Sequence, residues 1–393
     1  MNESKGRNLQ LDVLRGVAIV LVICEHMVLV DTRAGWAAPL AGALQRGGWT
    51  GVDLFFVLSG FLIGGLLFRE ISREGTLDLR RFLIRRAFKI WPAYFIFLAF
   101  VGARLVRHST SAAAGLAPLV PNLFHVQNYF TTGIPQAVVH TWSLAAEEHF
   151  YLALPLLLLV LCRTGKLSWV PAITAMIAIA CLGMRLSRWS VPFVAQSNYV
   201  PTHLRADSLF FGVLLAYVYH LRPALLAFVP RFRLALFIVG LALVAPMFFI
   251  LWEHPFVFTF GYTMNYLGYG CILIACVDAR TGPLGWALTG RMARVLGFIG
   301  FFSYSIYLWH LFARDLVLDR MHSMEQTGAG AFVLTTSMHV ALSIAFGVIS
   351  AKVVEQPFLR LRDLVFPPRT RPTQPDRFLG TIHGSTIPPK LAA

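Results

Sequence analysis

The sequence is poor in charge. Only 13% of its 393 residues are Asp, Glu, Lys or Arg, about half of the roughly 25% that is usual in soluble globular domains. Acidic residues are the scarcer kind, with 19 Asp and Glu against 34 Lys and Arg, while 57% of the residues are hydrophobic. This composition argues against a soluble protein and indicates that most of the chain lies in a membrane.

Several functional signatures are missing as well. The five cysteines fall in or beside apolar runs without CxxC spacing, so we predict no disulfide framework and no metal site. The sequence has no Walker A loop, no GxGxxG opening a helix and no HExxH, which argues against an ATPase, a dinucleotide enzyme and a zinc protease. The basic residues are scattered between apolar runs, which argues against a nucleic-acid partner.

Apolar runs long enough to cross a bilayer as helices recur along the chain. They predict an all-α, polytopic membrane helix bundle with about ten transmembrane helices. The predicted spans cover residues 9–30, 51–68, 90–106, 143–161, 169–184, 206–221, 234–252, 257–277, 297–317 and 331–351. The first run contains Arg15, Glu25 and His26, which the apolar core of a signal peptide would not hold, so we predict a retained span.

The basic residues also predict the orientation, because Lys and Arg collect on the cytoplasmic side. Most of them fall in segments that are cytoplasmic if the N-terminus is, so both termini are expected inside and the connection over 107–142 outside. The basic segment 69–89 is expected to lie along the inner face, against membrane lipids. Residues 1–365 form the predicted membrane domain, and 366–393 a disordered Pro- and Arg-rich cytoplasmic tail.

Ionisable residues inside membrane spans are costly and are therefore candidate functional residues. Arg15 and His26 are eleven positions apart, which places them about 20° apart around a helix and about 16 Å apart along it. One helix face would then present a cation near the cytoplasm and an imidazole in the outer half. The alternative for His26 is a hydrogen-bonding contact between helices.

Other polar residues are expected at the depth of His26 because they occur near the predicted outer ends of further spans. They are Asp53, Glu147, Glu148, Arg205, Asp207 and His310. In a packed bundle these side chains would line one outward cavity. The alternative for Arg205 and Asp207 is a structural ion pair.

The inner face has a cluster of its own, made of Arg80, Arg81, Arg85, Arg86 and Lys89. Such clusters commonly set topology or contact anionic lipids. The alternative is a cytoplasmic ligand rich in phosphate, such as a nucleotide-bearing acyl donor, which guanidinium groups bind well.

Seven stretches of the sequence, in this order, resemble the acyltransferase-3 family of integral-membrane acyltransferases. They are LDVLRGVAIVLVICEH (11–26), GVDLFFVLSGFLI (51–63), RRAFKIWPAY (85–94), HTWSLAAEEHFYLALP (140–155), RADSLFFG (205–212), FFSYSIYLWH (301–310) and VVEQPF (353–358). The resemblance implies a ten-helix enzyme that transfers an acyl group, usually acetyl, from cytoplasmic acyl-CoA to a hydroxyl of a cell-envelope or exported glycan.

The resemblance also implies roles for individual residues. Arg15 and His26 would be essential, with His26 the catalytic group, and Trp142 and Glu147 would belong to the active region. Arg85, Arg86 and Lys89 would bind the donor phosphates, with Arg15 as a further donor-binding residue. The family has arginine where this chain has Lys89, which keeps the charge but loses the planar fork.

Acyl transfer needs a base for the alcohol proton, donors for the developing oxyanion, and exclusion of water. We expect His26 to be the base and Glu147 to orient its imidazole. Arg205 or His310 would face the oxyanion, and Trp142, Arg205, Asp207 and His310 are the predicted substrate-binding residues.

The sequence therefore predicts an O-acetyltransferase of a bacterial inner membrane. Acetyl-CoA would be its donor substrate and a glycan or lipid-linked saccharide its acceptor, and no permanently bound cofactor is expected. The alternatives are transfer of another acyl group such as succinyl, a macrolide-like small-molecule acceptor, a secondary transporter, and a noncatalytic scaffold. Transporters often show paired broken helices in two halves, a pattern that we do not find.

Overall fold

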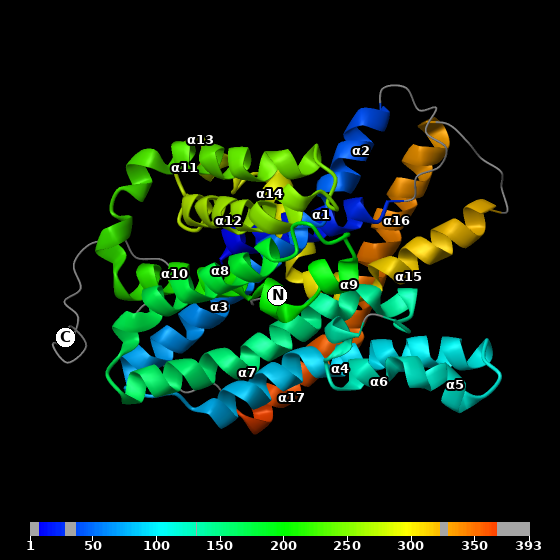
Figure 1. The fold of residues 1–393 in the computed structure, drawn as a ribbon, viewed down its shortest axis with the longest axis horizontal. Coiled ribbons are helices and arrows are strands. Elements are labelled where there is room, and N and C mark those ends of the chain that lie inside the picture. The colour runs from blue at the N-terminus through cyan, green and yellow to red at the C-terminus, as the bar shows by residue number, and fades with distance from the viewer. Residues whose placement is uncertain (1–7, 28–36, 131, 323–328, 368–393) are drawn as a thin grey trace.

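The computed structural model of the chain describes residues 8–27, 37–130, 132–322 and 329–367. Every regular element in these ranges is helical, and they contain no strand (Figure 1). The prediction of an all-α fold is therefore confirmed. The predicted tail over 366–393 lies outside the described residues, apart from Phe366 and Pro367.

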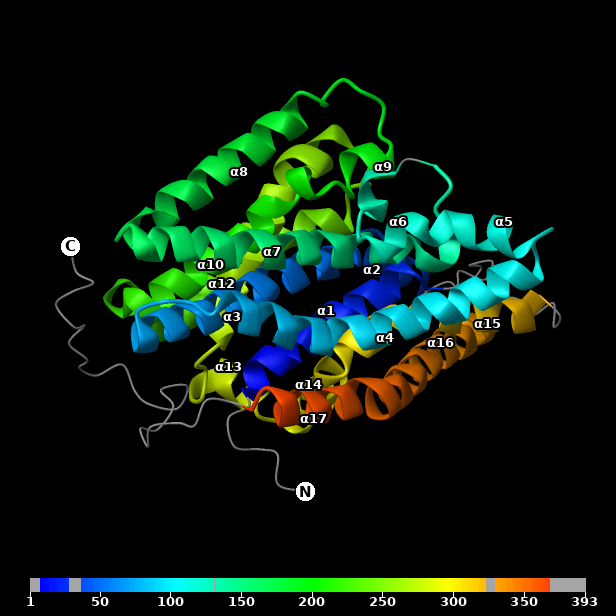
Figure 2. The ribbon, with the colours of Figure 1, turned by 90° about the horizontal axis from the view of Figure 1, so that it is seen from below.

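Long helices make up most of the bundle. They are α1 (Leu9–Glu25), α2 (Ala37–Gly47), α3 (Thr50–Glu74), α4 (Leu79–Arg107), α7 (Trp142–Arg163), α8 (Val170–Leu186), α10 (Ala206–Leu221), α11 (Val229–Val244), α12 (Tyr262–Cys276), α14 (Arg291–Phe301), α15 (Ser303–His322), α16 (Ala329–Ser350) and α17 (Gln356–Val365). Figure 2 shows α8 at one edge of the bundle and the run of α16 and α17 along the opposite edge.

Short helical pieces join the long helices. The short α-helices are α5 (Ala112–Leu116), α6 (Val120–Leu123), α9 (Ala195–Asn198) and α13 (Gly282–Ala287). The 3₁₀ turns are η1 (Ala117–Leu119), η2 (Gln127–Tyr129), η3 (Gln136–Thr141), η4 (Leu167–Trp169), η5 (Thr202–Leu204), η6 (Pro223–Leu226) and η7 (Ala245–Phe248). Two π-helical turns are η8 (Val257–Gly261) and η9 (Ala351–Glu355).

Six helical runs among the described residues are long and apolar enough to cross a membrane. They are Thr50–Glu74, Leu79–Arg107, Gln136–Arg163, Leu167–Leu186, Val229–Phe248 and Gly330–Val365. Helices α1 and α10 have 17 and 16 residues, short of the roughly 20 that a full crossing needs. Helix α12 has 15 residues but continues directly from the five-residue turn η8. The chain is thus a multi-pass helical protein, while the count of ten and the sides of the termini stay predictions.

The predicted span over 297–317 is not one straight helix, because α14 and α15 meet at a bend of 80°. Helix α14 crosses α1 at two glycines. A Cβ at Gly300 would lie 1.8 Å from the Asp12 carbonyl oxygen, and one at Gly16 would lie 2.1 Å from the Leu296 carbonyl oxygen. The two backbones are therefore in direct contact, whereas α15 turns away and packs along α16.

The basic segment 69–89 does not form a separate helix along one face. Helix α3 continues to Glu74 and ends at Gly75, whose φ of 69° lies in the left-handed region that favours glycine. Helix α4 begins after Asp78, whose side chain accepts a hydrogen bond from the Arg81 backbone nitrogen at 3.0 Å. The cationic residues of the predicted inner cluster therefore stand on the first three turns of α4 itself.

The connection over 107–142 is folded into short helices, and its polar side chains bond one another. The Asn122 amide donates to the Thr141 hydroxyl at 2.9 Å, and the Gln127 amide donates to the Thr141 carbonyl at 2.8 Å. Its last turn, η3, continues into α7, so this helical run begins at Gln136. The predicted outer position of the connection remains untested.

Candidate active site

Three histidine rings meet where α1 ends against α15 and η3. His26 is the residue that caps the C-terminus of α1. Its ring centroid lies 5.0 Å from that of His310, which in turn lies 5.0 Å from that of His140. His26 and His310, which were expected to lie near each other, are therefore in contact. We call these three residues the histidine cluster.

Hydrogen bonds fix the orientation of two of these rings. Nδ1 of His26 lies 2.9 Å from the Val22 carbonyl oxygen, and Nδ1 of His310 lies 2.7 Å from the Tyr307 carbonyl oxygen. A carbonyl oxygen can only accept, so each Nδ1 carries the proton and each Nε2 has a free lone pair. His26 is the accessible member, with 20% of its side chain exposed, whereas His310 is fully buried.

Arg205 pairs with Asp53 and not with Asp207. Its guanidinium donates to Asp53 at 2.5 Å, and both side chains are 1% exposed. The guanidinium also lies over Tyr262 and Tyr199, with 4.1 and 4.7 Å to the ring centroids. Trp142 faces the same guanidinium at 5.8 Å. The structure therefore brings two of the predicted substrate-binding residues, Arg205 and Trp142, into one buried contact.

Asp207 belongs to a second buried ion pair. It accepts a hydrogen bond from Arg185 at 2.7 Å, and these side chains are 2% and 1% exposed. Arg185 was not among the predicted site residues, although an arginine in the last turn of an apolar helix was a usable signal. The interpretation of Arg205 and Asp207 as an ion pair with each other is wrong. Arg205 pairs with Asp53 on α3, and Asp207 pairs with Arg185 on α8.

Glu147 lies deeper than its predicted place beside His26. It accepts hydrogen bonds from the hydroxyls of Ser59 and, at 3.1 Å, Tyr151. Arg15 and Arg86 both interact electrostatically with this carboxylate. The reason is that the helical run starts at Gln136, so position 147 is already three turns into it. Glu147 therefore belongs to a charged group at the other end of α1.

This group, which we call the cation cluster, contains Arg15, Arg86 and Lys89. The three side chains interact electrostatically with one another. Lys89 is paired with Glu355 at 3.3 Å. Arg86 faces the rings of Phe82 and Tyr151, but neither Arg15 nor Arg86 has a hydrogen bond or ion pair within the described ranges. Two guanidinium groups are thus available to an anion.

Glu355 reaches the cation cluster through the π-turn η9. The wider turn interrupts the regular helix between α16 and α17, and such turns commonly occur at functional positions. Besides Lys89, Glu355 accepts a hydrogen bond from Ser305 at 3.1 Å. The motif VVEQPF contained this carboxylate, but its role as the partner of Lys89 was not predicted.

Arg85 points away from the cation cluster. It donates to the Phe366 carbonyl at 2.6 Å and pairs with Asp363 of α17 at 3.2 Å. Neighbouring positions on a helix face different directions, which separates Arg85 from Arg86. Of the four predicted donor-binding residues, the structure brings together Arg15, Arg86 and Lys89 only.

One face of η3 and α7 connects the two clusters. His140, Ser143, Glu147 and Tyr151 follow one another at helical spacing. The Ser143 and Tyr307 hydroxyls are 2.7 Å apart, and the Tyr307 hydroxyl donates to the His140 carbonyl at 2.7 Å. Polar groups on η3 and α7 thus run from the histidine cluster towards the cation cluster.

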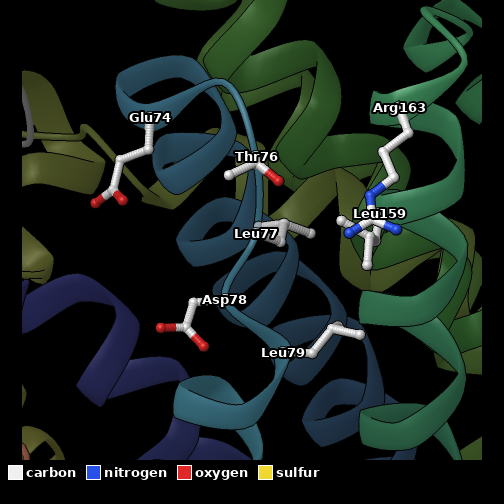
Figure 3. Close-up of a pocket in the computed structure, with 7 residues that line it drawn as sticks. All are labelled: Glu74, Thr76, Leu77, Asp78, Leu79, Leu159 and Arg163. Atoms are coloured by element: carbon white, nitrogen blue, oxygen red, sulfur yellow. The ribbon is translucent and has the colours of Figure 1, made fainter.

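One pocket lies away from both clusters. It has a volume of about 430 Å³ and is lined by Glu74, Thr76, Leu77, Asp78, Leu79, Leu159 and Arg163, where α3, α4 and α7 meet (Figure 3). Leu159 is eight residues beyond Tyr151 on α7, about 12 Å further from the histidine cluster. None of the predicted site residues lines this pocket. No cluster of metal-ligating side chains occurs in the ranges that the structure describes.

Comparisons with known proteins show which family the chain belongs to. Residues 8–349 match a family model described as an acyltransferase domain, that of the acyltransferase-3 family. A Staphylococcus aureus (strain COL) protein named "Putative O-acetyltransferase" is 30% identical over 365 residues, covering 88% of this chain and 56% of that protein. The Listeria monocytogenes protein "Peptidoglycan O-acetyltransferase OatA" is 31% identical over 327 residues, covering 76% and 48% respectively. The chain spans about half the length of these curated relatives, and no solved structure matches it.

Proposed function

Because the chain belongs to the acyltransferase-3 family, we propose that it is a membrane O-acyltransferase. It takes an acyl group, acetyl in the first instance, from acyl-CoA on the cytoplasmic side of a bacterial inner membrane. It places that group on a hydroxyl of a cell-envelope glycan. The naming of a relative as a peptidoglycan O-acetyltransferase makes peptidoglycan the first acceptor to test.

The observation that supports this function most directly is the position of two guanidinium groups, those of Arg15 and Arg86, beside Lys89. Within the described ranges, neither guanidinium has a hydrogen bond or a close ion pair. A guanidinium binds phosphate through parallel, charge-assisted hydrogen bonds, and CoA carries phosphates at the end distant from its thioester. Lipid headgroups also offer phosphate, but Arg86 is enclosed by Phe82 and Tyr151, which favours a ligand that enters the bundle.

The distance between the clusters suits the donor. Arg15 and His26 stand on one helix, about 16 Å apart by the helical rise, which is of the order of an extended pantetheine arm. With its phosphates on the cation cluster, the donor would run along α1 and α7 and present its thioester at the histidine cluster. The burial of His310 and His140 limits the access of water, which would otherwise hydrolyse the thioester.

His26 is the general base in this proposal. Its Nε2 is the free nitrogen, and it removes the proton of the acceptor hydroxyl as the oxygen attacks the acyl carbon. The carbon–sulfur bond then breaks, and the proton passes to the leaving thiolate of CoA. The products are an O-acyl glycan and free CoA, so no net charge is gained or lost.

The test is transfer of radiolabelled acetyl from acetyl-CoA to peptidoglycan fragments by the purified protein in lipid vesicles. An Arg86→Met variant should weaken acetyl-CoA binding at least tenfold, because the methionine keeps packing with Phe82 but removes the charge. Arg81→Met is the matched control, since Arg81 bonds the Pro367 carbonyl at the exposed start of α4. Equal donor affinity in the two variants would contradict the donor site, and labelled solute moved without covalent transfer would favour the transporter alternative.

A further inference from the structure

The rings of the histidine cluster differ in how they use their N–H groups. A neutral imidazole has one N–H donor and one acceptor nitrogen. His26 and His310 commit their N–H groups to the Val22 and Tyr307 carbonyls. A further histidine behind them, His339, directs Nε2 at the His310 carbonyl at 3.0 Å. The N–H groups of these three rings are therefore directed at backbone carbonyls. The other nitrogen of each neutral ring can only accept a hydrogen bond from a ligand.

His140 is the exception. Its side chain is 4% exposed, and neither ring nitrogen makes a hydrogen bond to any described residue. The Leu308 backbone lies near enough to interact with the ring, but it does not meet the geometry of a hydrogen bond to either ring nitrogen. A buried donor without a partner costs free energy, so an imidazole held in this state indicates that something else bonds to it.

The position of this ring is well defined. The His140 carbonyl accepts a hydrogen bond from the Tyr307 hydroxyl at 2.7 Å, and Phe97 and His310 pack edge-on against the ring at 5.7 and 5.0 Å between centroids. His140 stands at the histidine-cluster end of the polar face of α7, where the acyl end of the donor would lie. It also interacts electrostatically with His26.

We propose that His140 is a second catalytic residue, which donates its ring N–H to the acyl carbonyl oxygen. This inference rests on the proposed function. As the acceptor oxygen attacks the carbonyl carbon, negative charge develops on the carbonyl oxygen, and the hydrogen bond from His140 stabilises it. The proton stays on His140 throughout, while His26 carries the proton from the acceptor hydroxyl to the leaving thiolate.

The test compares two substitutions with opposite properties in the full-length protein in lipid vesicles. His140→Phe keeps a ring among aromatic neighbours but has no donor. His140→Asn is smaller but keeps an N–H donor. If the N–H stabilises the oxyanion, His140→Phe should lower kcat by about 10²- to 10³-fold, with acetyl-CoA affinity unchanged, and His140→Asn should recover at least tenfold of that loss.

His125→Asn is the matched control. His125 is another buried histidine, stacked on Tyr94 at 4.6 Å and outside the histidine cluster. Burial lowers its pKa to about 4, and its φ of 55° suits asparagine. This variant should keep wild-type kcat, which separates loss of the His140 donor from loss of any buried imidazole.

The outcomes are distinguishable. Higher kcat for His140→Phe than for His140→Asn would make His140 a packing residue and overturn the inference alone. If the His140→Phe variant does not fold, the inference is tested with His140→Asn alone. The kcat of that variant should remain measurable, and its dependence on pH should keep the wild-type shape. A kcat of His140→Asn below one thousandth of wild type in a folded protein would also overturn it. A wild-type protein that transfers no acyl group from acyl-CoA would overturn the proposed function first, and the inference with it.

Discussion

The chemistry of His26 depends on which of its two ring nitrogens is free. The contact from Nδ1 to the Val22 carbonyl at 2.9 Å leaves Nε2 as the acceptor nitrogen of the neutral ring. In the interior of a helix, the Val22 carbonyl would accept a hydrogen bond from the backbone N–H four residues later. Because α1 ends at Glu25, this carbonyl is available to the His26 ring. The end of the helix therefore orients the proposed base.

This leads to a test that separates chemistry from packing. His26→Gln keeps polarity and much of the size, but a glutamine cannot take up a proton near neutral pH. We expect kcat to fall by about 10²- to 10⁴-fold with acetyl-CoA affinity and thermal stability retained. Near-normal acyl transfer by the glutamine variant would return His26 to the role of a contact between helices.

A second residue-scale prediction concerns stability. Asp53→Asn leaves the guanidinium of Arg205 buried without its counter-charge, which typically costs about 3–5 kcal/mol. Asp363→Asn is the matched control, because Asp363 is 44% exposed where it pairs with Arg85, and such pairs contribute under about 1 kcal/mol. Thermal unfolding of the two variants in detergent should differ clearly, and equal unfolding temperatures would contradict the structural role of the pair.

The sequence predicts the residues of the site better than their partners. His26 and His310 are expected at one depth because each lies near the outer end of an apolar run. The partner of Arg205 was not predictable, since neighbours two positions apart on a helix do not face each other. Asp207 thus pairs with a residue of α8 and Arg205 with a residue of α3. Only the packing of those helices determines which residues form ion pairs.

At the scale of helices, the contact between α1 and α14 is the tightest that the site depends on. A Cβ at Gly300 would lie 1.8 Å from the Asp12 carbonyl oxygen, so Gly300→Ala must push the helices apart. We expect a loss of about 1–3 kcal/mol in unfolding free energy, together with lower activity, because α1 carries Arg15 and ends at His26.

The matched control for this prediction is Gly183→Ala. Gly183 lies in α8, where an added Cβ would meet no other atom within 4 Å, so alanine there should be neutral or stabilise the helix by up to about 1 kcal/mol. Thermal unfolding and acetyl transfer would be measured for both variants. A Gly300→Ala protein as stable and active as Gly183→Ala would show that the helices tolerate separation.

Helix positions were predictable where an apolar run ends in polar residues, as in α8 and α10. The bend between α14 and α15 was not, because the hydrophobic composition continues across it. The start of α4 at Leu79 was missed for another reason. Its first turns are basic, and composition alone assigns such residues to a surface segment.

At the scale of the whole molecule, the excess of Lys and Arg in alternate connections predicts which of them are cytoplasmic. Reporter fusions after Gly165 and Pro230 should therefore be cytoplasmic, and a fusion near Thr132 external. Activity of paired cytoplasmic and external reporters measures each position. A cytoplasmic result at Thr132 would contradict the ten-span arrangement, and the shorter helices α1 and α10 would be the first candidates for incomplete crossings.

The backbone contact between α1 and α14 has a consequence for selectivity. Arg15 and the proposed base belong to one helix, α1, whose backbone is in direct contact with that of α14, so the two groups are held at a fixed separation. This fixed separation selects the length of the donor between its phosphates and its thioester carbon. It places no limit on the part of the acyl group that extends past that carbon. Lengthening the arm by one methylene should misplace the reacting bond, while lengthening the acyl tail should not, so acyl preference has to arise from the room around the histidines.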